Sequence, residues 1–365
     1  MHVALPIAVL GLFIFAIWYT PHRLHMYFPS IPFWALQIST ALLAISASAA
    51  SLATLKLSNK LAGFMNIIGG YVLLFFIYLF FLLIFLRLIQ NTLNFPFPLH
   101  GATALALALI VTAAGAVMGE GFVVRETKVI ISGLEKELTV MHISDVHIGH
   151  HRGRKYLAGI VEETNKRAPD LVVITGDLAD AEPALLPGAL DPLSDFTAPV
   201  YFVEGNHEEY LGSGRVLKII EQQGVRVLRN NVVETHGIQV IGIGYMKADE
   251  SSFDMHPSNK TDTVKSVLGK LAIKKGVPSI LLHHSPVGSR YAEAAGINLM
   301  LSGHTHGGQI FPFSLLSKIF FPFHSGMYQQ GNTKVFVSNG AGTFLIRVRL
   351  GSFNEINLVK LVPDV

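Results

Sequence analysis

Five short polar runs between positions 145 and 306 hold the side chains best suited to metal chemistry. They combine hard oxygen donors with imidazoles, a mixture that suits a pair of divalent transition ions better than one structural zinc. Two such ions a few ångströms apart can clamp a phosphoester and ionise the water that attacks it. The runs are Asp145-Val146-His147, Gly176-Asp177, Gly205-Asn206-His207-Glu208, His283-His284-Ser285-Pro286 and Gly303-His304-Thr305-His306.

Four of these five runs directly follow an apolar segment that is typical of a buried strand. Loops at the carboxyl ends of strands carry side chains into a shared crevice, while the sheet fixes their positions. Glycines at 176, 205 and 303 let the backbone pass close to an ion where a Cβ would obstruct it. We therefore expect the five runs to meet at one place.

The elements that position these runs begin at Gly121, where short apolar segments alternate with polar, Gly-rich or Pro-rich turns. The pattern predicts an α/β fold in which a two-sheet β-sandwich is flanked by helices. The expected helices are Arg154–Arg167, Gly214–Gln223 and Lys260–Lys274. The expected strands include Val123–Ile131, Leu138–Ile143, Leu171–Thr175, Val200–Val203, Val225–Leu228, Val232–Glu234, Ile238–Ile243, Ser279–Leu282, Leu299–Leu301, Val335–Val337, Arg347–Arg349 and Glu355–Leu361.

The first third of the chain has a different composition. Residues 1–120 carry only five charged side chains, whereas charges are ordinary from Arg125 onward. A helix crossing a membrane needs about 17–25 predominantly apolar residues. We predict about four transmembrane helices in residues 1–120 and a catalytic domain in residues 121–365. The four apolar stretches are Val3–Tyr19, Pro32–Leu55, Phe64–Leu86 and Gly101–Met118.

Two alternatives to four spans were weighed. Buried core helices are one, but four in succession with almost no charge could not be covered by a soluble domain of this size. A cleaved signal peptide is the alternative for Val3–Tyr19; it lacks a charged start and a small-residue cleavage site, so we take it as retained. The absence of cysteine excludes disulfides and cysteine ligands without choosing a compartment.

The ordered motifs resemble the calcineurin-like metallophosphoesterase superfamily. They are Asp145-x-His147, Gly176-Asp177-x-x-Asp180, Gly205-Asn206-His207-Glu208, His284-x-Pro286 and Gly303-His304-x-His306. The segments Leu301–Ile310 and Val337–Thr343 are similar to the membrane-associated bacterial subgroup of the YkuE/YaeI type. The resemblance covers about Val124 to Leu361 and does not include the apolar stretches.

The resemblance implies a dinuclear site that uses manganese, iron or zinc. One ion would be held by Asp145, His147, Asp177 and His306, and the other by Asp177, Asn206, His284 and His304, with Asp177 bridging. His207 would approach the phosphate and help to protonate the leaving group. Because two ions lower the pKa of bound water, a metal-bound hydroxide is the expected nucleophile.

Several neighbouring histidines leave alternatives open. His283 could replace His284 as a ligand, although the His-x-Pro spacing favours His284. His150 and His151, beside Arg152, form either a solvated basic turn or a patch that holds a second phosphate or an anionic headgroup. Asp180 and Glu208 either orient ligand imidazoles or cap and solvate the loops.

We therefore expect a membrane-anchored phosphohydrolase that cleaves a phosphodiester or a pyrophosphate. The apolar, Pro-broken segment Ile310–His324 is either core packing or an aromatic lip that admits a lipid-linked or envelope-precursor substrate. The alternative function is an inactive or regulatory membrane scaffold on the same fold. A transporter would need more polar spans. The net charge of +3 without a basic stripe argues against a nucleic-acid partner.

The expected location is the bacterial inner membrane, in which the chain spans several times. With four spans, Lys56, Lys60, Arg125 and Lys128 lie on the side of the catalytic domain. Lys and Arg are enriched in cytoplasmic loops, so this excess favours the cytoplasmic side. The sequence does not indicate the oligomeric state.

Overall fold

A computed structural model of the chain describes residues 4–53, 59–89, 97–252, 256, 258 and 260–364. The chain divides into two compact units, Met1–Met118 and Gly119–Val365. Each unit has its own hydrophobic interior and is considered separately below.

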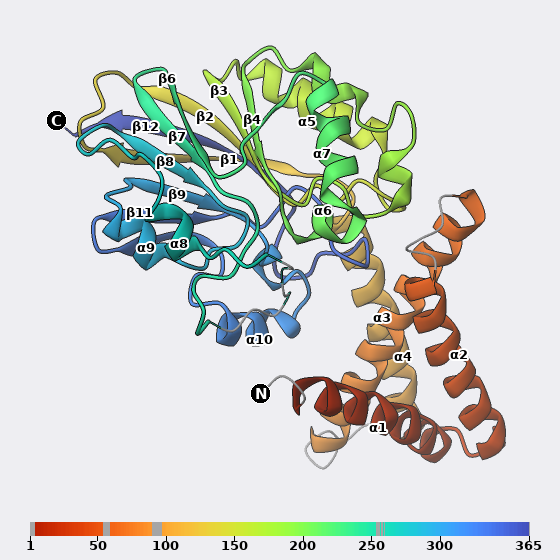
Figure 1. Cartoon of the computed structure of the whole chain (residues 1–365). Helices are drawn as coiled ribbons and strands as arrows, with labels where there is room; N and C mark the ends of the chain where they lie inside the picture. The colour runs from red at the N-terminus through yellow and green to blue at the C-terminus, as the bar shows by residue number, and fades with distance from the viewer. Residues whose placement is uncertain are drawn as a thin grey trace. The chain divides into compact units, whose positions relative to one another are not determined.

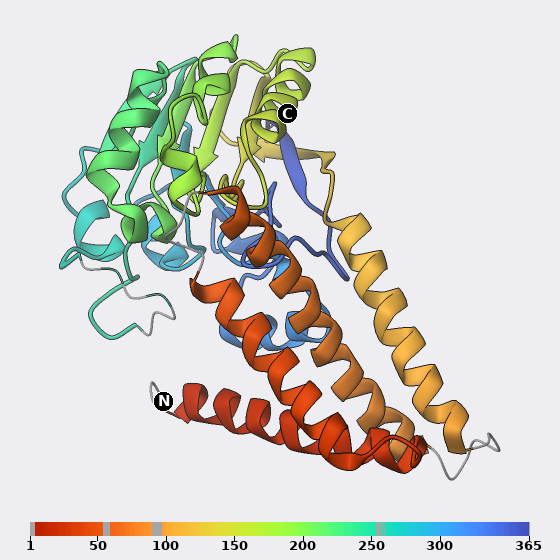
Figure 2. The ribbon, with the colours of Figure 1, turned by 90° about the vertical axis from the view of Figure 1, so that its right-hand side faces the viewer.

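The first unit consists of four helices: α1 (Ala4–Tyr27), α2 (Phe33–Ala53), α3 (Lys60–Ile89) and α4 (Phe97–Met118). Within this unit, α1 lies across α2, α3 and α4 (Figures 1 and 2). Among the described residues, three helical segments are long and apolar enough to cross a membrane: Phe33–Ala50, Lys60–Ile89 and Leu99–Met118.

The prediction of four spans is therefore corrected to three candidate spans. The described part of α1 does not qualify, because its C-terminal part carries His22, Arg23 and His25. The start of the predicted span Val3–Tyr19, the end of Pro32–Leu55 and the charge of Lys56 lie outside the described residues.

Small residues of α2 and α4 face their neighbours, while large apolar side chains face outward. Ala44 and Ala104 are fully buried, whereas Leu42 and Leu109 are 64% and 62% exposed. Small residues let helices approach closely in lipid, where no hydrophobic effect drives their association. The outward apolar surface is what a lipid-facing bundle requires.

The second unit contains two mixed sheets of six strands, which confirms the predicted two-sheet sandwich flanked by helices (Figure 1). The first sheet has the order β1 (Val123–Ile131), β12 (Glu355–Pro363), β2 (Leu138–Ile143), β3 (Leu171–Thr175), β4 (Val200–Val203), β5 (Arg226–Val227). The second has the order β10 (Gly326–Gln330), β11 (Thr333–Val337), β9 (Leu299–Ser302), β8 (Ser279–Leu282), β7 (Ile238–Gly242), β6 (Asn231–Thr235).

The central strands are buried on both faces, which explains their continuous apolar sequences. In β3, Leu171 and Val173 pack in the cluster shared by the two sheets, together with Leu282 and Leu301 of the second sheet. The alternate residue Val172 points to the opposite face, into the cluster that includes residues of α5 (Arg154–Lys166) and α7 (Ser213–Gln222). A third cluster joins the outer face of the second sheet to α8 (Val264–Leu268) and α9 (Ser289–Ala294).

Three predicted elements differ in the structure. The helix expected over Lys260–Lys274 is confined to α8, which begins after the capping residue Thr263 and ends before Gly269. The expected strand Arg347–Arg349 is irregular backbone, because Arg349 is committed to several hydrogen bonds. The segment after position 310 forms the short helix α10 (Phe313–Phe320).

The parallel strands β2, β3 and β4 of one sheet and β8 and β9 of the other end near the polar runs. Asp145 and Asp177 follow the ends of β2 and β3 by two positions. His284 and His304 stand in the same relation to β8 and β9. The carboxyl ends of strands from both sheets therefore present the candidate ligands.

Burial of Leu171 between the sheets predicts a stability effect. Leu171→Ala should lower the free energy of unfolding by about 2–5 kcal/mol, because it removes a fully buried side chain and leaves a cavity. Thermal unfolding of the full chain in detergent measures the change. The control Leu186→Ala, at a 48% exposed position, should have a much smaller effect. Equal effects for the two variants would contradict the described core.

Candidate metal centre

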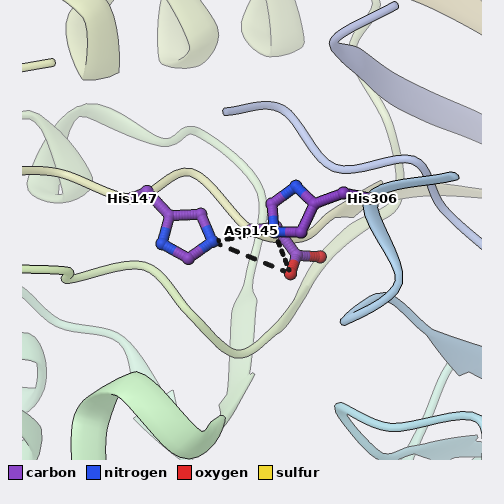
Figure 3. A group of neighbouring side chains, drawn as sticks. All are labelled: Asp145, His147 and His306. Carbon is purple, nitrogen blue, oxygen red and sulfur yellow. Dashed lines mark hydrogen bonds and ion pairs between the residues drawn. The ribbon is translucent and has the colours of Figure 1, made fainter. Parts of the chain in front are cut away.

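The structure brings the histidines and aspartates of the polar runs into three overlapping groups. Within each group, one potential ligand atom per residue lies within 4.8 Å of the others. Figure 3 shows the first group, in which three side chains from two distant loops point toward one another. The groups are Asp145, His147 and His306; Asp177, His284 and His304; and His147, Asp180 and His207.

Short distances join these groups into one site. His284 Nε2 lies 3.1 Å from Asp177 Oδ2, and His306 Nε2 lies 3.4 Å from Asp145 Oδ1. His147 Nε2 is 3.9 Å from both Asp145 Oδ1 and Asp177 Oδ2. The Asp177 carboxylate therefore lies between the first two groups, next to an imidazole of each.

Pairs of imidazole nitrogens face each other across the site. His147 Nε2 lies 3.1 Å from His306 Nε2, and His284 Nε2 lies 3.0 Å from His304 Nδ1. A neutral imidazole has one nitrogen with a lone pair, so such a pair is satisfied by one shared proton or by a cation that both lone pairs approach. The pairing fits divalent metal ligation.

The tautomer of His284 is set by the protein. Its Nδ1 lies 2.7 Å from the carbonyl oxygen of Thr175, which can only accept a hydrogen bond. Nδ1 must therefore carry the proton, and Nε2 presents its lone pair toward Asp177 when the ring is neutral. With no cation in the site, burial lowers the pKa of His284, but Asp177 and Asp145 outweigh it and raise the pKa to about 10. A bound cation would displace that proton.

Asn206 supplies a second observation that fits a cation. Its Oδ1 is buried and has no hydrogen-bond partner among the described residues. The next residue, His207, donates its backbone N–H to Asp177 Oδ1 at 3.0 Å, which places the first turn of α6 (Asn206–Leu211) against the site. A buried amide oxygen without a donor is costly, and a metal ligand bond would satisfy it.

His207 is held by a carboxylate rather than by a partner ligand. Its Nδ1 lies 2.7 Å from Asp180 Oδ1, while its Nε2 lies 3.9 Å from Asp177 Oδ2. Burial lowers the pKa of His207, but the carboxylates of Asp177 and Asp180 raise it to about 9 in the cation-free site. The ring is therefore oriented and able to carry a proton. Asp180 also lies 3.3 Å from His147 Nδ1.

Glu208 stabilises the loop that carries Asp177 and does not contact an imidazole. Its carboxylate accepts the backbone N–H groups of Asp177 at 2.9 Å, Leu178 at 2.8 Å and Gly205 at 2.7 Å. These bonds join the loop after β3 to the loop after β4. Of the two acidic residues left open by the sequence, Asp180 therefore contacts imidazoles and Glu208 contacts backbone.

Five candidate ligands adopt left-handed backbone conformations, which are uncommon for residues other than glycine. The φ angles are 52° at Asp145, 53° at His147, 52° at Asp177, 71° at His304 and 52° at His306. Such conformations cost about 1–3 kcal/mol each and cluster at functional sites. The surrounding hydrogen bonds hold these ligands in place at a local cost in stability.

Close backbone approach explains two of the glycines. A Cβ at Gly303 would lie 1.9 Å from Ser144 Oγ and 2.1 Å from Asp145 Oδ2. A Cβ at Gly205 would lie 2.1 Å from Asp177 Oδ1. Any side chain at either position would displace a candidate ligand.

Arg349 positions the site but was missed by the sequence reasoning. Its fully buried guanidinium donates to the carbonyl oxygens of His306 at 2.5 Å, Asn339 at 2.5 Å and Gly342 at 2.6 Å. These contacts fix the backbone of a candidate ligand from a residue more than 40 positions away. No local sequence signal distinguishes Arg349 from a surface arginine.

Aromatic rings line the ligands and were also missed. The Phe344 ring centroid lies 5.4 Å from that of His207 and 6.2 Å from that of His147. The Tyr245 ring lies 5.6 Å from His304, on the opposite group. By contrast, His283 is fully buried, belongs to none of the three groups, and has its pKa lowered by burial to about 3. The geometry favours His284 over His283.

Comparisons with known proteins agree with this geometry. A model of the calcineurin-like phosphoesterase family matches residues 138–308. An uncharacterized metallophosphoesterase from Helicobacter pylori strain J99 is 34% identical over 247 residues, which cover 66% of this chain and 64% of the relative. An uncharacterized metallophosphoesterase from Aquifex aeolicus is 31% identical over 62% of this chain and 85% of its own length.

A further relative combines the same domain with membrane segments. A protein from Danio rerio named as a transmembrane protein with metallophosphoesterase domain is 32% identical over 276 residues, covering 70% of this chain and 62% of the relative. The chain thus spans 62–64% of the length of the Helicobacter and Danio relatives. From the family match and the Aquifex relative, this chain belongs to the calcineurin-like phosphoesterase family.

Proposed function

We propose that this chain is a membrane-anchored phosphohydrolase that uses two divalent cations to cleave a phosphodiester or a pyrophosphate. The observation that carries the proposal is the convergence of buried carboxylates with facing pairs of imidazole nitrogens. Three candidate spans in the same chain, and relatives named as transmembrane proteins, support the anchoring.

The residues divide naturally between two cations. Asp145, His147 and His306 would hold one cation, with His284, His304 and Asn206 around the other and Asp177 shared. Manganese, iron or zinc would suit this set of oxygen and nitrogen donors. When bound, two such cations lower the pKa of coordinated water and neutralise charge on the phosphoryl oxygens.

We assign His207 the role of proton donor to the leaving group. Asp180 holds its Nδ1, so Nε2 is the nitrogen left to meet substrate. An alkoxide leaving group needs a proton, and an oriented imidazolium supplies it. Phe344, whose ring packs against His207, limits the positions that the imidazole can adopt.

The segment after the last ligands supports a lipid-linked substrate. α10 begins five residues after Gly308, the end of the short helix η4 (His306–Gly308). Its Leu315, Leu316 and Ile319 are 52%, 51% and 75% exposed. Such a surface suits contact with the apolar part of a membrane or lipid. Phe321, which follows α10, lies 5.5 Å from the His304 ring, so the lip begins beside the site.

We also propose that the chain resides in a bacterial inner membrane with the catalytic domain on the cytoplasmic side. The bacterial relatives support the first part. The basic residues Lys60, Arg125 and Lys128 support the second, because Lys and Arg are enriched in cytoplasmic loops.

Removal of the shared carboxylate tests whether the chain is an enzyme or an inactive scaffold. Asp177→Asn should lower the manganese content of the purified full chain and reduce hydrolysis of bis(p-nitrophenyl) phosphate by at least about 100-fold, since metal chemistry supplies most of the charge stabilisation. Asp191→Asn, at an exposed position, is the matched control. A metal-free unchanged chain that hydrolyses the ester normally would sink the proposal, and a metal-loaded but inactive chain would favour the scaffold.

Replacement of His207 tests its role through the leaving group. His207→Gln should slow hydrolysis of an alkyl phosphodiester by about 10²–10⁴-fold, because an alkoxide needs the proton. The nitrophenyl ester should be slowed much less, since nitrophenolate leaves without protonation. His236→Gln, in an exposed turn, should change neither rate. An equal loss for both esters would show that His207 acts in another way.

The lip on α10 predicts a selective effect on lipid substrates. Replacing Leu315, Leu316 and Ile319 by Ser should reduce cleavage of a lipid-linked pyrophosphate in mixed micelles while leaving cleavage of the soluble ester unchanged. The matched control replaces Leu186 and Ile130, which are exposed at 48% and 52% on other elements. An unchanged ratio of the two activities in the α10 variant would remove the lip from the account.

A further inference from the structure

A second pocket of the catalytic unit lies between the loop 151–153, helix α5 and the segment that opens the unit. Its volume is about 520 Å³, large enough for a phosphate group with its substituent. None of the candidate metal ligands lines it. The walls are formed by Glu120, Gly121, Phe122, His151, Arg152, Gly153, Lys155, Tyr156, Gly159 and Arg347.

The charge of this pocket is positive. Arg152, Lys155 and Arg347 line it with one carboxylate, that of Glu120, which pairs with Arg347 at 2.8 Å. Lys155 is exposed, on the first turn of α5. A concave surface lined by one sign of charge concentrates ligands of the opposite sign.

Arg152 is buried without a carboxylate partner. It is only 3% exposed, and its guanidinium donates to Thr343 Oγ1 at 2.6 Å and to the carbonyl oxygen of Gly119 at 2.5 Å. It also lies over the Tyr156 ring, 4.6 Å from the centroid. All three partners are neutral. Buried charges are usually paired, so an anionic ligand would supply the counter-charge that the described residues lack.

Two polar atoms in the same wall are buried without a partner among the described residues: Arg152 Nε and His151 Nδ1. His151 Nε2 lies 2.9 Å from the carbonyl oxygen of Leu345 and must donate to it, which leaves Nδ1 as an acceptor in the neutral ring. Unsatisfied buried groups are few in folded proteins and point to a missing partner. Two in adjacent residues of one cavity wall point to a ligand.

The sequence ties this pocket to the end of a candidate span. Glu120 and Gly121 follow Met118, the last residue of α4, by two and three positions. Consecutive Cα atoms are about 3.8 Å apart, so this wall of the pocket lies within roughly 12 Å of the end of α4. Phosphate headgroups occupy the zone in which a membrane-spanning helix ends.

We propose that this pocket is a second anion site, which binds the phosphate of an anionic phospholipid headgroup separately from the metal centre. Arg152 and Lys155 supply the charge, and His151 Nδ1 can accept a hydrogen bond from a headgroup hydroxyl. The site does not depend on the hydrolytic activity, because no candidate metal ligand contributes to it.

Titration calorimetry on the detergent-solubilised full chain tests this site. A short-chain phosphatidylglycerol is the probe, and a chelator keeps the metal centre from binding it. The unchanged chain should bind phosphatidylglycerol, and Lys155→Ala should weaken binding by about five-fold, as expected for one cation near a phosphate. Lys218→Ala, an exposed lysine on α7, is the matched control and should bind like the unchanged chain.

Arg152→Gln should weaken binding at least as much, and its thermal unfolding midpoint shows whether it remains folded. If it does not fold, Lys155→Ala decides. Short-chain phosphatidylcholine should bind more weakly than phosphatidylglycerol, and inorganic phosphate should compete only at higher concentration. Equal binding of phosphatidylglycerol by Lys155→Ala and the unchanged chain would overturn the proposal. Equal affinity for inorganic phosphate would overturn its assignment to lipid.

Discussion

The arrangement of the catalytic unit depends on bringing buried, mutually repelling donors together. Asp145 and Asp177 are almost fully buried in one small volume, and two pairs of imidazole nitrogens face each other at 3.0–3.1 Å. Like charges and facing lone pairs in a low-dielectric interior are unfavourable unless something positive lies among them. Protons can serve in part, as the raised pKa of His284 shows. Divalent cations would satisfy the whole set, including the unpartnered amide oxygen of Asn206.

The rest of the unit holds these donors against their repulsion. Two sheets present strand ends from both sides of the site, and the core between them fixes the strands. Glu208 then joins two ligand loops through backbone N–H groups, and Arg349 holds the carbonyl of His306. The left-handed φ angles of five candidate ligands show that the loops are held by these contacts rather than by their own preferences. Stability elsewhere supports local strain at the site.

Much of this architecture could be predicted from sequence, because its signals are local. Apolar segments such as Leu171–Thr175 predict buried strands, and motifs such as Gly303-His304-Thr305-His306 place ligands at their ends. The roles of Arg349 and Phe344 could not be predicted, since they arise from contacts between segments distant in sequence. The number of candidate spans was overestimated, because the described part of α1 combines an apolar start with a polar end. The pocket beside Arg152 appeared in the sequence only as a basic turn.

The most direct test of the account is a crystal structure of the full chain grown with manganese, with anomalous scattering recorded near the manganese edge. The account predicts two anomalous peaks about 3.5–4 Å apart, with a carboxylate oxygen of Asp177 in contact with both. A single peak, or two peaks that do not share Asp177, would contradict the dinuclear site on which the proposed hydrolysis depends.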